Sequence, residues 1–500
     1  MKPHPRIFLW FILLLLAACG HDHDDTQAER ANVTVVEHTP GSTPFIRTLV
    51  LGVEHVEDLK RVSYSITPKP GTYSKPVAVD YERAWLDRRN AYAAASRRLS
   101  LPVFGLYANH ANIVTVDVAF ADGSVHHAQV TMETPAHTAA DAFYGTPTIR
   151  TARTAAPLPG LDFIEIHSSL TTPVIIDSDG NLRWVATGLY NSLTTLFSAN
   201  GFFVGCPDAP LLYRIELDGS LSTTPLAEPT YTNFHHDLAA GKNGLLAELD
   251  ALENGVANLE SILAELSPSG QVLKQWNLAQ IFRDAMLAGD DDPSNFVRDG
   301  FDWFHMNSAI YSRADDALYV SSRENFVVKL DYETSRILWV LGDPTKHWHS
   351  YPSLRALALR TEAGNPPVGQ HSLSIDADGK LLLFNNGAPS FNHPAGTPAG
   401  VTIPYSAPVK YAIDERKRTA TATWTFEHGR DIVSDICSSV FDTGNATYLV
   451  TYSAAESRTR ARLMGLDQGG KVAFDFDYPT ANCATAFLAK PFPFDALSFD

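Results

Sequence analysis

Three histidines stand at matching places in three successive stretches of the sequence. His236, His305 and His371 each come before a strand-like run that ends in an Asp, Asn or Gly turn and is followed by a returning apolar run. Each histidine therefore opens a predicted hairpin. Imidazole changes charge near neutral pH, so it can serve as a nucleophile, an acid or a base.

The returning strands add further polar groups to this set. Eighteen residues separate His305 from Arg323, which leaves room for one strand, a turn and the strand that returns beside it. We therefore expect Arg323 on the same face as His305, with Asn307 on the same side of the first strand. The aromatic residues expected to form the walls of the pocket are Phe234, Trp303 and Phe384.

Two kinds of ligand suit imidazoles that meet in one pocket. Zinc is the first, because histidine is its commonest nitrogen ligand. The fixed charge of Arg323 repels a metal, whereas a guanidinium beside neutral donors grips a tetrahedral oxyanion such as sulfate or phosphate. We therefore predict an oxyanion-transfer site without a metal or other cofactor. The alternative is that the histidines are separate core or capping residues.

The elements that must position these residues form a β-rich repeat. From residue 160 onward, an acidic or Ser/Gly turn is followed by an alternating strand that often contains Trp or Phe. Six copies of this pattern occur: DSDGNLRWV from Asp177, ELDGSLSTT from Glu216, LSPSGQVLKQW from Leu266, LDYETSRILWV from Leu330, IDERKRTATATW from Ile413 and LDQGGKVAFDF from Leu466. A four-stranded unit repeated six times is typical of a β-propeller, in which the first strand of each unit lines a central channel. The alternative is a large β-sandwich in which the six segments are similar by chance. One helix, near residues 278–288, is expected to interrupt the repeat.

The predicted fold class is all-β, a six-bladed β-propeller preceded by a small N-terminal β-sandwich-like domain. A hairpin with its turn at Asp122-Gly123 is the clearest part of that first domain. The expected segments are a lipoprotein signal peptide (1–19), a polar tether (20–31), the N-terminal β domain (32–135), a linker rich in Thr, Ala and Pro (136–159) and the propeller (160–500).

The first residues indicate export. Lys2 and Arg6 precede an apolar run, residues 7–16, that is too short to span a bilayer and is typical of a signal peptide. The run ends in Leu-Ala-Ala-Cys, which looks like a bacterial lipobox with Cys19 as the lipidated residue; a plain cleavage site is the alternative. With Gly20 after the cysteine, we expect a lipoprotein on the periplasmic side, anchored in the outer membrane, with no other membrane contact.

Composition limits the classes of partner and of covalent cross-link. The 500 residues are 45% hydrophobic and 19% charged, as in a globular chain with a large core. A net charge of −17 gives no basic surface for nucleic acid, so we expect no nucleic-acid partner. Apart from Cys19, the cysteines are Cys206, Cys437 and Cys483, so at most one disulfide can form within the chain.

Several of these strings resemble those of one family. FHHD around His236, DWFHMNS around His305, SSR ending at Arg323 and QHS around His371 are similar to motifs of the bacterial aryl-sulfate sulfotransferases that use no nucleotide sulfate donor. LPVFGLYANHANIVTV in the N-terminal unit extends the resemblance over most of the chain. The resemblance implies a six-bladed propeller, a homodimer formed through the N-terminal domain, a phenolic sulfate donor and a phenol acceptor.

The resemblance also implies a role for each residue. His371 is expected to be the nucleophile that is transiently sulfated and His236 the general acid or base. His305 and Arg323 are expected to stabilise the sulfuryl oxygens. The residues expected to bind substrate are Asn307, Trp303 and Phe234.

Two other activities remain open: an aryl sulfate hydrolase, and a binding or scaffold propeller with no catalysis. One departure concerns cysteine, because members of the family carry a close cysteine pair shortly before the nucleophilic histidine and residues 345–370 contain none. Cys437 is expected either to face the channel as a free thiol or to pair with Cys483 or Cys206.

Overall fold

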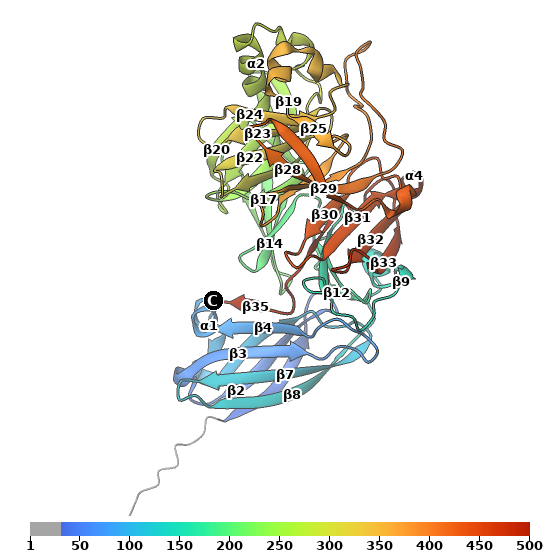
Figure 1. Ribbon diagram of the computed structural model, residues 1–500. Helices are drawn as coiled ribbons and strands as arrows, with labels where there is room; N and C mark the ends of the chain where they lie inside the picture. Colours follow the sequence, from blue (N-terminus) through green and yellow to red (C-terminus); the bar gives the residue numbers. More distant parts are fainter. Residues whose placement is uncertain (1–31) are drawn as a thin grey trace, which may run out of the picture.

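The computed structural model describes residues 32–500 and consists of two β-rich parts (Figure 1). The predicted signal peptide, Cys19 and the tether lie outside the described residues. Within residues 32–500, no helix has both the length and the apolar character needed to cross a membrane.

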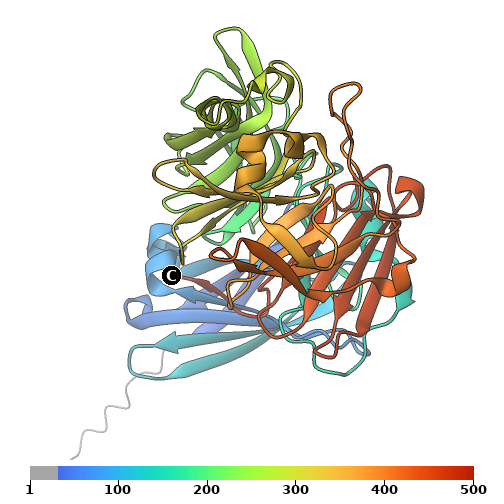
Figure 2. The same ribbon diagram turned by 45° about the horizontal axis from the view of Figure 1, so that its top comes forward.

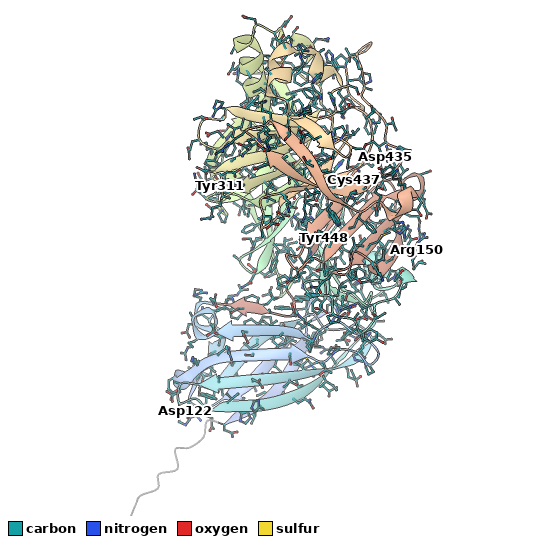
Figure 3. All side chains as sticks on the ribbon, in the orientation of Figure 1. Asp122, Arg150, Tyr311, Asp435, Cys437 and Tyr448 are labelled. Carbon is teal, nitrogen blue, oxygen red and sulfur yellow. A yellow bond between two sulfur atoms is a disulfide. The ribbon has the colours of Figure 1, made fainter. Side chains whose placement is uncertain are left out.

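The N-terminal part contains two sheets that enclose an apolar core. One sheet has the order β1 (Val33–Pro40), β2 (Ile46–Val53), β6 (Arg98–Phe104), β5 (Tyr92–Ala93). The other has the order β35 (Leu497–Phe499), β4 (Val77–Glu82), β3 (Leu59–Ile66), β7 (His110–Phe120), β8 (Val125–Thr134). The predicted hairpin is present as β7 and β8, and alternate residues of β7 are buried, as expected for a strand with one face on the core. Figure 3 shows its turn, at Asp122, at the end of this part that is far from the propeller.

Six further sheets form the second part, and each contains at least four strands. The first is β12 (Leu182–Trp184), β11 (Val174–Asp177), β10 (Phe163–His167), β34 (Leu488–Pro491). The second is β13 (Thr195–Ser198), β14 (Gly201–Gly205), β15 (Leu211–Glu216), β16 (Leu221–Pro225). The third is β17 (Tyr231–Ala240), β18 (Leu245–Glu253), β19 (Val256–Leu266), β20 (Val272–Asn277).

The remaining three sheets continue in chain order. The fourth is β21 (Met306–Ser312), β22 (Ala317–Ser322), β23 (Phe326–Asp331), β24 (Ile337–Gly342). The fifth is β25 (Arg360–Ala363), β29 (Thr419–Thr425), β28 (Ala407–Asp414), β27 (Leu381–Asn385), β26 (His371–Ile375). The sixth is β30 (Ser439–Asp442), β31 (Tyr448–Ala454), β32 (Arg460–Leu466), β33 (Val472–Pro479), β9 (Thr148–Thr151).

These sheets are the blades of a propeller, which confirms the predicted fold class. Strand β17 contacts β21, β21 contacts β26, β26 contacts β30, and β30 contacts β34, so these strands are the inner strands of their blades, at the centre of the ring. Each of the six repeated turn patterns joins the two outer strands of the original four-stranded unit in one blade. The repeat found in the sequence is therefore the outer hairpin of every blade.

Short helices occur in both parts. The α-helices are α1 (Arg83–Arg88), α2 (Leu278–Ala288), α3 (Pro352–Leu357) and α4 (Ala455–Arg458). The 3-10 helices are η1 (Val56–Asp58), η2 (Ala94–Ser96), η3 (Ala140–Gly145), η4 (Pro293–Asn295), η5 (His347–Ser350) and η6 (His428–Arg430). Helix α2 occupies the predicted range and begins after Asn277, whose side chain accepts a hydrogen bond from the backbone N–H of Gln280.

Two segments differ from the predicted division of the chain. Strand β9 lies in the range predicted as a linker, yet it pairs with β33 as the outer strand of the sixth blade. Strand β35 lies in the range predicted as propeller, yet it runs parallel to β4 in the N-terminal part, where Figures 1 and 2 show the C-terminus beside the blue strands. Both short strands satisfy backbone groups of a sheet edge that the sequence pattern did not show.

Candidate active site

His371 begins the inner strand of the fifth blade and is 3% exposed. Its Nδ1 lies 2.8 Å from Oδ1 of Asn386 and 3.1 Å from the carbonyl oxygen of Gly369. Its Nε2 accepts a hydrogen bond of 3.2 Å from the backbone N–H of Cys437. Burial, together with the charges of Arg323 and His305, lowers the pKa of His371 to about 3. The ring is therefore neutral at physiological pH, as a nitrogen nucleophile must be.

His236 and His305 lie against each other on the third and fourth blades, with ring centroids 4.7 Å apart. Both have left-handed backbones, with φ of 49° and 50°. The pairing of β17 with β18 shifts register between Phe234 and Leu238, so His236 sits in a β-bulge. A bulge bends a strand and redirects a side chain, which here brings an imidazole from each blade to the same place.

His305 carries the positive charge of this pair. Its Nδ1 lies 2.5 Å from Oδ2 of Asp302 and 2.7 Å from Oε2 of Glu260. Burial alone lowers the pKa of His305, but the hydrogen bonds to these two carboxylates outweigh it and raise the pKa to about 9. Burial lowers the pKa of His236 well below its usual range, and the charge of His305 lowers it further. His236 is thus neutral beside a protonated neighbour.

Arg323 follows directly after β22 and joins the same cluster. Its backbone N–H donates a 3.1 Å hydrogen bond to the carbonyl oxygen of His305, and its charge depresses the pKa of both His236 and His371. Its Nε donates a 2.8 Å hydrogen bond to Oε1 of the buried Glu324. The structure therefore brings together the four residues to which the sequence assigned catalytic roles.

Two aromatic residues predicted to bind substrate, Trp303 and Phe234, are buried in hydrophobic clusters. Trp303 is 5% exposed in a hydrophobic cluster with Phe282 of α2, and Phe234 is fully buried in another. Phe234 packs over Gly205, where a Cβ atom would come within 2.4 Å of its ring. The core covers the ring of Phe234, which contradicts the prediction that it lines a substrate pocket. Trp303 also borders a small cavity with Glu324 and Asn392, and its role toward a substrate stays a prediction. Phe384, also fully buried, packs against Tyr452.

Asn307 is also buried, at 3% exposure, on the inner strand β21. Its Nδ2 donates a 2.8 Å hydrogen bond to the carbonyl oxygen of Gln370, the residue before His371. Its Oδ1 has no hydrogen-bond partner among the described residues. Asn307 thus connects the strands that position His305 and His371, and its role toward a substrate stays a prediction.

The histidines also offer atoms that a metal could use. His236, Glu260 and His305 have ligand atoms within 4.8 Å of one another, and so do His235, His236 and Glu248. Imidazole and carboxylate are donors that transition metals accept. In the first group, Glu260 forms an ion pair with His305. This ion pair accounts for the position of the Glu260 carboxylate without a bound metal.

Comparison with known proteins bears on what this cluster does. Residues 150–487 match the model of the arylsulfotransferase (ASST) family, and residues 47–135 match that of the arylsulfotransferase Ig-like domain. The chain belongs to the arylsulfotransferase family. The resemblance seen in the motifs is thereby confirmed, and the predicted N-terminal β domain matches the Ig-like domain of this family.

Two curated relatives are distant in sequence. The arylsulfate sulfotransferase AssT of Escherichia coli O6:H1 is 24% identical over 330 residues, which cover 53% of this chain and 54% of that protein. The AssT of Lelliottia amnigena is 23% identical over 332 residues, with the same coverage. The chain thus spans about half the length of the curated relatives it matches.

Two solved structures align more loosely. The β-propeller domain of Cps50 (Swd1) from Myceliophteria thermophila aligns with a TM-score of 0.34 and 11% identity, covering 65% of this chain and 83% of that one. BamB from Moraxella catarrhalis aligns with a TM-score of 0.29 and 12% identity, covering 73% of this chain and 91% of that one. The propeller assignment rests on the sheet order described above.

This family member has its disulfide close to His371. Cys437 is bonded to Cys483, and Cys206 is the free cysteine within residues 32–500. Figure 3 shows Cys437 among the strands of the propeller. Of the alternatives left open for Cys437, the pair with Cys483 is the one present. The backbone N–H of Cys437 faces Nε2 of His371. The disulfide between Cys437 and Cys483 therefore constrains a backbone segment of the site.

Sequence reasoning missed the residues that surround the four catalytic candidates. Asp302 could have been noticed, because it lies three residues before His305. Glu260 lies on β19 of the preceding blade, and no local pattern connects it with His305. Phe391, in the loop after β27, is 45% exposed and has its ring centroid 4.8 Å from the guanidinium of Arg323. It is the exposed aromatic ring that contacts the cluster.

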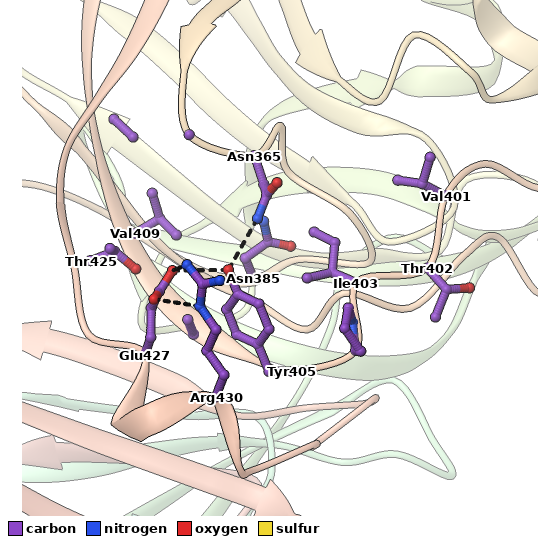
Figure 4. Close-up of a pocket in the computed structure, with 14 residues that line it drawn as sticks. Asn365, Asn385, Val401, Thr402, Ile403, Tyr405, Val409, Thr425, Glu427 and Arg430 are labelled. Atoms are coloured by element: carbon purple, nitrogen blue, oxygen red, sulfur yellow. Dashed lines mark hydrogen bonds and ion pairs between the residues drawn. The ribbon is translucent and has the colours of Figure 1, made fainter.

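A cavity of about 600 Å³ lies beside the fifth blade (Figure 4). Tyr405, Glu427 and Arg430 on its wall interact with one another, with Tyr405 donating a 2.9 Å hydrogen bond to Glu427. None of the four catalytic candidates lines this cavity. The cavity is thus separate from the histidine cluster. We take the cluster as the candidate active site because it holds the histidines whose pKa values are shifted by burial and by neighbouring charges.

Proposed function

We propose that this chain transfers a sulfuryl group from a phenolic sulfate ester to a phenol through a transient sulfohistidine on His371. The observation that supports the proposal best is the pairing of a neutral, buried His371 with the cations of His305 and Arg323. A neutral imidazole can attack sulfur, and the two cations can balance the charge of the sulfuryl oxygens.

In the first half-reaction, Nε2 of His371 attacks the sulfur of the donor. The N–S bond forms while the bond from sulfur to the aryl oxygen breaks, and the leaving phenolate needs a proton. His236 is the proposed donor of that proton. The bound sulfate ester adds a negative charge beside His236, which raises the pKa of its imidazolium and favours the protonated form.

In the second half-reaction, a phenol replaces the departed product. Neutral His236 takes the phenolic proton, the phenol oxygen attacks sulfur, and the N–S bond breaks to restore His371. Charge spreads over the sulfuryl oxygens in both steps, as it does in phosphoryl transfer, and this is where Arg323 and His305 are proposed to act. The order of events predicts ping-pong kinetics.

The experiment is intact-protein mass spectrometry after brief mixing with 4-nitrophenyl sulfate. We expect the mass to rise by one sulfuryl group, the gain to be absent in His371→Ala, and added phenol to remove it. Release of 4-nitrophenol at an equal rate with and without phenol, with no phenyl sulfate formed, would favour the hydrolase. A complete lack of turnover with several aryl sulfates would favour the binding propeller.

We also propose that the chain is an exported, outer-membrane lipoprotein and that its N-terminal domain forms a homodimer. The lipobox-like sequence before Cys19 supports the first part. Replacing Cys19 by Ala should abolish incorporation of a labelled fatty acid and release the chain from the membrane fraction. Sedimentation of the purified chain tests the dimer.

A further inference from the structure

Asn386 is a buried amide that contacts Nδ1 of the proposed nucleophile and the backbone segment that faces its Nε2. It follows β27 directly and is 1% exposed. Its Oδ1 lies 2.8 Å from Nδ1 of His371. Its Nδ2 donates hydrogen bonds of 2.7 Å to the carbonyl oxygen of Ser434 and 2.9 Å to that of Cys437.

These partners determine which way the amide points. Two carbonyl oxygens can be satisfied only by the NH₂ group of Asn386, so its Oδ1 must face the imidazole. An oxygen that faces Nδ1 of His371 requires a proton on that nitrogen, and the carbonyl of Gly369, 3.1 Å away, requires the same. Because the ring is neutral, its lone pair is then on Nε2, where the N–H of Cys437 is directed.

We propose that Asn386 is the positioning residue of the nucleophile: it keeps the proton of His371 on Nδ1 and, through the carbonyl oxygens of Ser434 and Cys437, holds the segment whose Cys437 N–H faces Nε2. The inference rests on the proposed function, since it assigns the sulfuryl group to Nε2. Asn386 does this through one side chain that spans the fifth and sixth blades.

The same contacts suit the covalent intermediate. When the Nε2–S bond forms, Nδ1 keeps its proton and the ring becomes cationic while the aryl oxygen leaves with the electron pair of the S–O bond. The Asn386 and Gly369 oxygens then accept a hydrogen bond from a charged ring, which is stronger than one from a neutral ring. The N–H of Cys437 loses Nε2 as its acceptor and lies beside the sulfuryl oxygens, to which it can donate.

The test is NMR of the protein labelled with ¹⁵N in its histidine rings, with the His371 signals identified by their loss in His371→Gln. We expect the wild-type ring to carry its proton on Nδ1 alone. Asn386→Leu removes the amide and should populate the form protonated on Nε2. Asn386→Asp keeps an oxygen facing the ring and should retain the Nδ1 proton. Turnover in Asn386→Leu should fall ~10- to 100-fold with little change in KM.

Asn385→Leu is the matched control. Asn385 is equally buried, and its amide also spans two backbone groups, the N–H of Val368 and the carbonyl of Pro366. The Asn385→Leu substitution should leave the spectrum of the His371 ring unchanged. Identical ring spectra in Asn386→Leu and wild type would overturn the inference, as would identical changes in the Leu and Asp variants. The spectrum needs no substrate, so it tests Asn386 even if no sulfohistidine is ever detected.

Discussion

At the level of single residues, the three histidines proposed to be catalytic differ because their surroundings differ. His371 faces amide and carbonyl groups, and burial keeps it neutral. His305 faces two carboxylates and is held as a cation. His236 has the cation of His305 against its ring and is neutral. Burial and neighbouring charges thus give one residue type two charge states in one cluster.

The pH dependence should follow His305. Its pKa of about 9 lies above the ordinary value of 6.5, so the cation is present at neutral pH and is lost as pH rises through about 9. If that cation stabilises the sulfuryl oxygens, kcat/KM should fall above about pH 9. Asp302→Asn should move the fall to lower pH, because the ring loses a carboxylate partner. A pH–rate profile of both proteins checks this, and identical alkaline limbs would contradict it.

Phe391 should contact the aryl ring of the substrate. Its exposed ring lies against Arg323, next to where the sulfuryl group is proposed to sit. Phe391→Ala should raise KM for aryl sulfates roughly 2- to 10-fold, the range expected for loss of one aromatic pair, with kcat little changed. Phe301 is the control, because it is 59% exposed and packs on Arg298 rather than Arg323. Equal KM values for wild type and Phe391→Ala would contradict the assignment.

At the level of elements, an irregularity recurs in the inner strands or directly before them. Left-handed backbones occur at His236, His305, Ser372 and Cys437, with φ between 49° and 56°. The first three lie at or beside shifts in strand register. Such conformations cost free energy in residues other than glycine and are frequent at active sites. In this propeller they occur at or next to the three histidines and at Cys437.

The disulfide should stabilise the segment that contains the Cys437 peptide. Cys437 and Cys483 are 46 residues apart, a separation for which the chain-entropy model gives about 4 kcal/mol. Cys483→Ser should lower both the melting temperature and turnover, the latter because the N–H that faces His371 is less well held. Cys206→Ser, which breaks no disulfide, is the control. Thermal melts and initial rates measure both effects, and a Cys483→Ser protein that matches the Cys206→Ser protein would contradict the prediction.

At the level of the whole molecule, distant parts of the chain close the ring and join the two parts. Strand β34, near the C-terminus, is the inner strand of the first blade, and β9, which precedes that blade, is the outer strand of the sixth. Strand β35 then leaves the propeller and pairs with β4. The largest hydrophobic cluster accordingly includes residues of both parts. The N-terminal part and the propeller should therefore unfold together.

Phe499 tests this coupling. It is 5% exposed and packs on Tyr81 and Trp85, with ring centroids 5.0 and 5.3 Å away. Phe499→Ala should destabilise the protein by about 3–5 kcal/mol, as expected for loss of a buried phenyl ring. Ser498→Ala, on the exposed side of the same strand, is the control. Thermal melts and limited proteolysis of the N-terminal part check it; unchanged behaviour would show that β35 is dispensable.

The sequence by itself determined the repeat and the identity of the reactive groups. Turn residues and alternating strands are local signals, so the outer hairpin of every blade and helix α2 could be recognised. The closeness of His305 and Arg323 could be predicted from their spacing, because the returning strand of a hairpin ends beside the start of the first strand. The motifs around the histidines are short strings of consecutive residues, so they too could be recognised in the sequence and indicated the family.

Only the tertiary structure decided the partners of these groups. Glu260 and Cys437 reach His305 and His371 from other blades, and Phe391 reaches Arg323 from a loop. Strands β9 and β35 pair with strands hundreds of residues away. The prediction that Phe234 lines the site was wrong for a related reason: a bulge directs His236 into the site while Phe234 packs in the core. Protonation and pairing depend on distances between segments far apart in the chain, and only closure of the ring sets those distances.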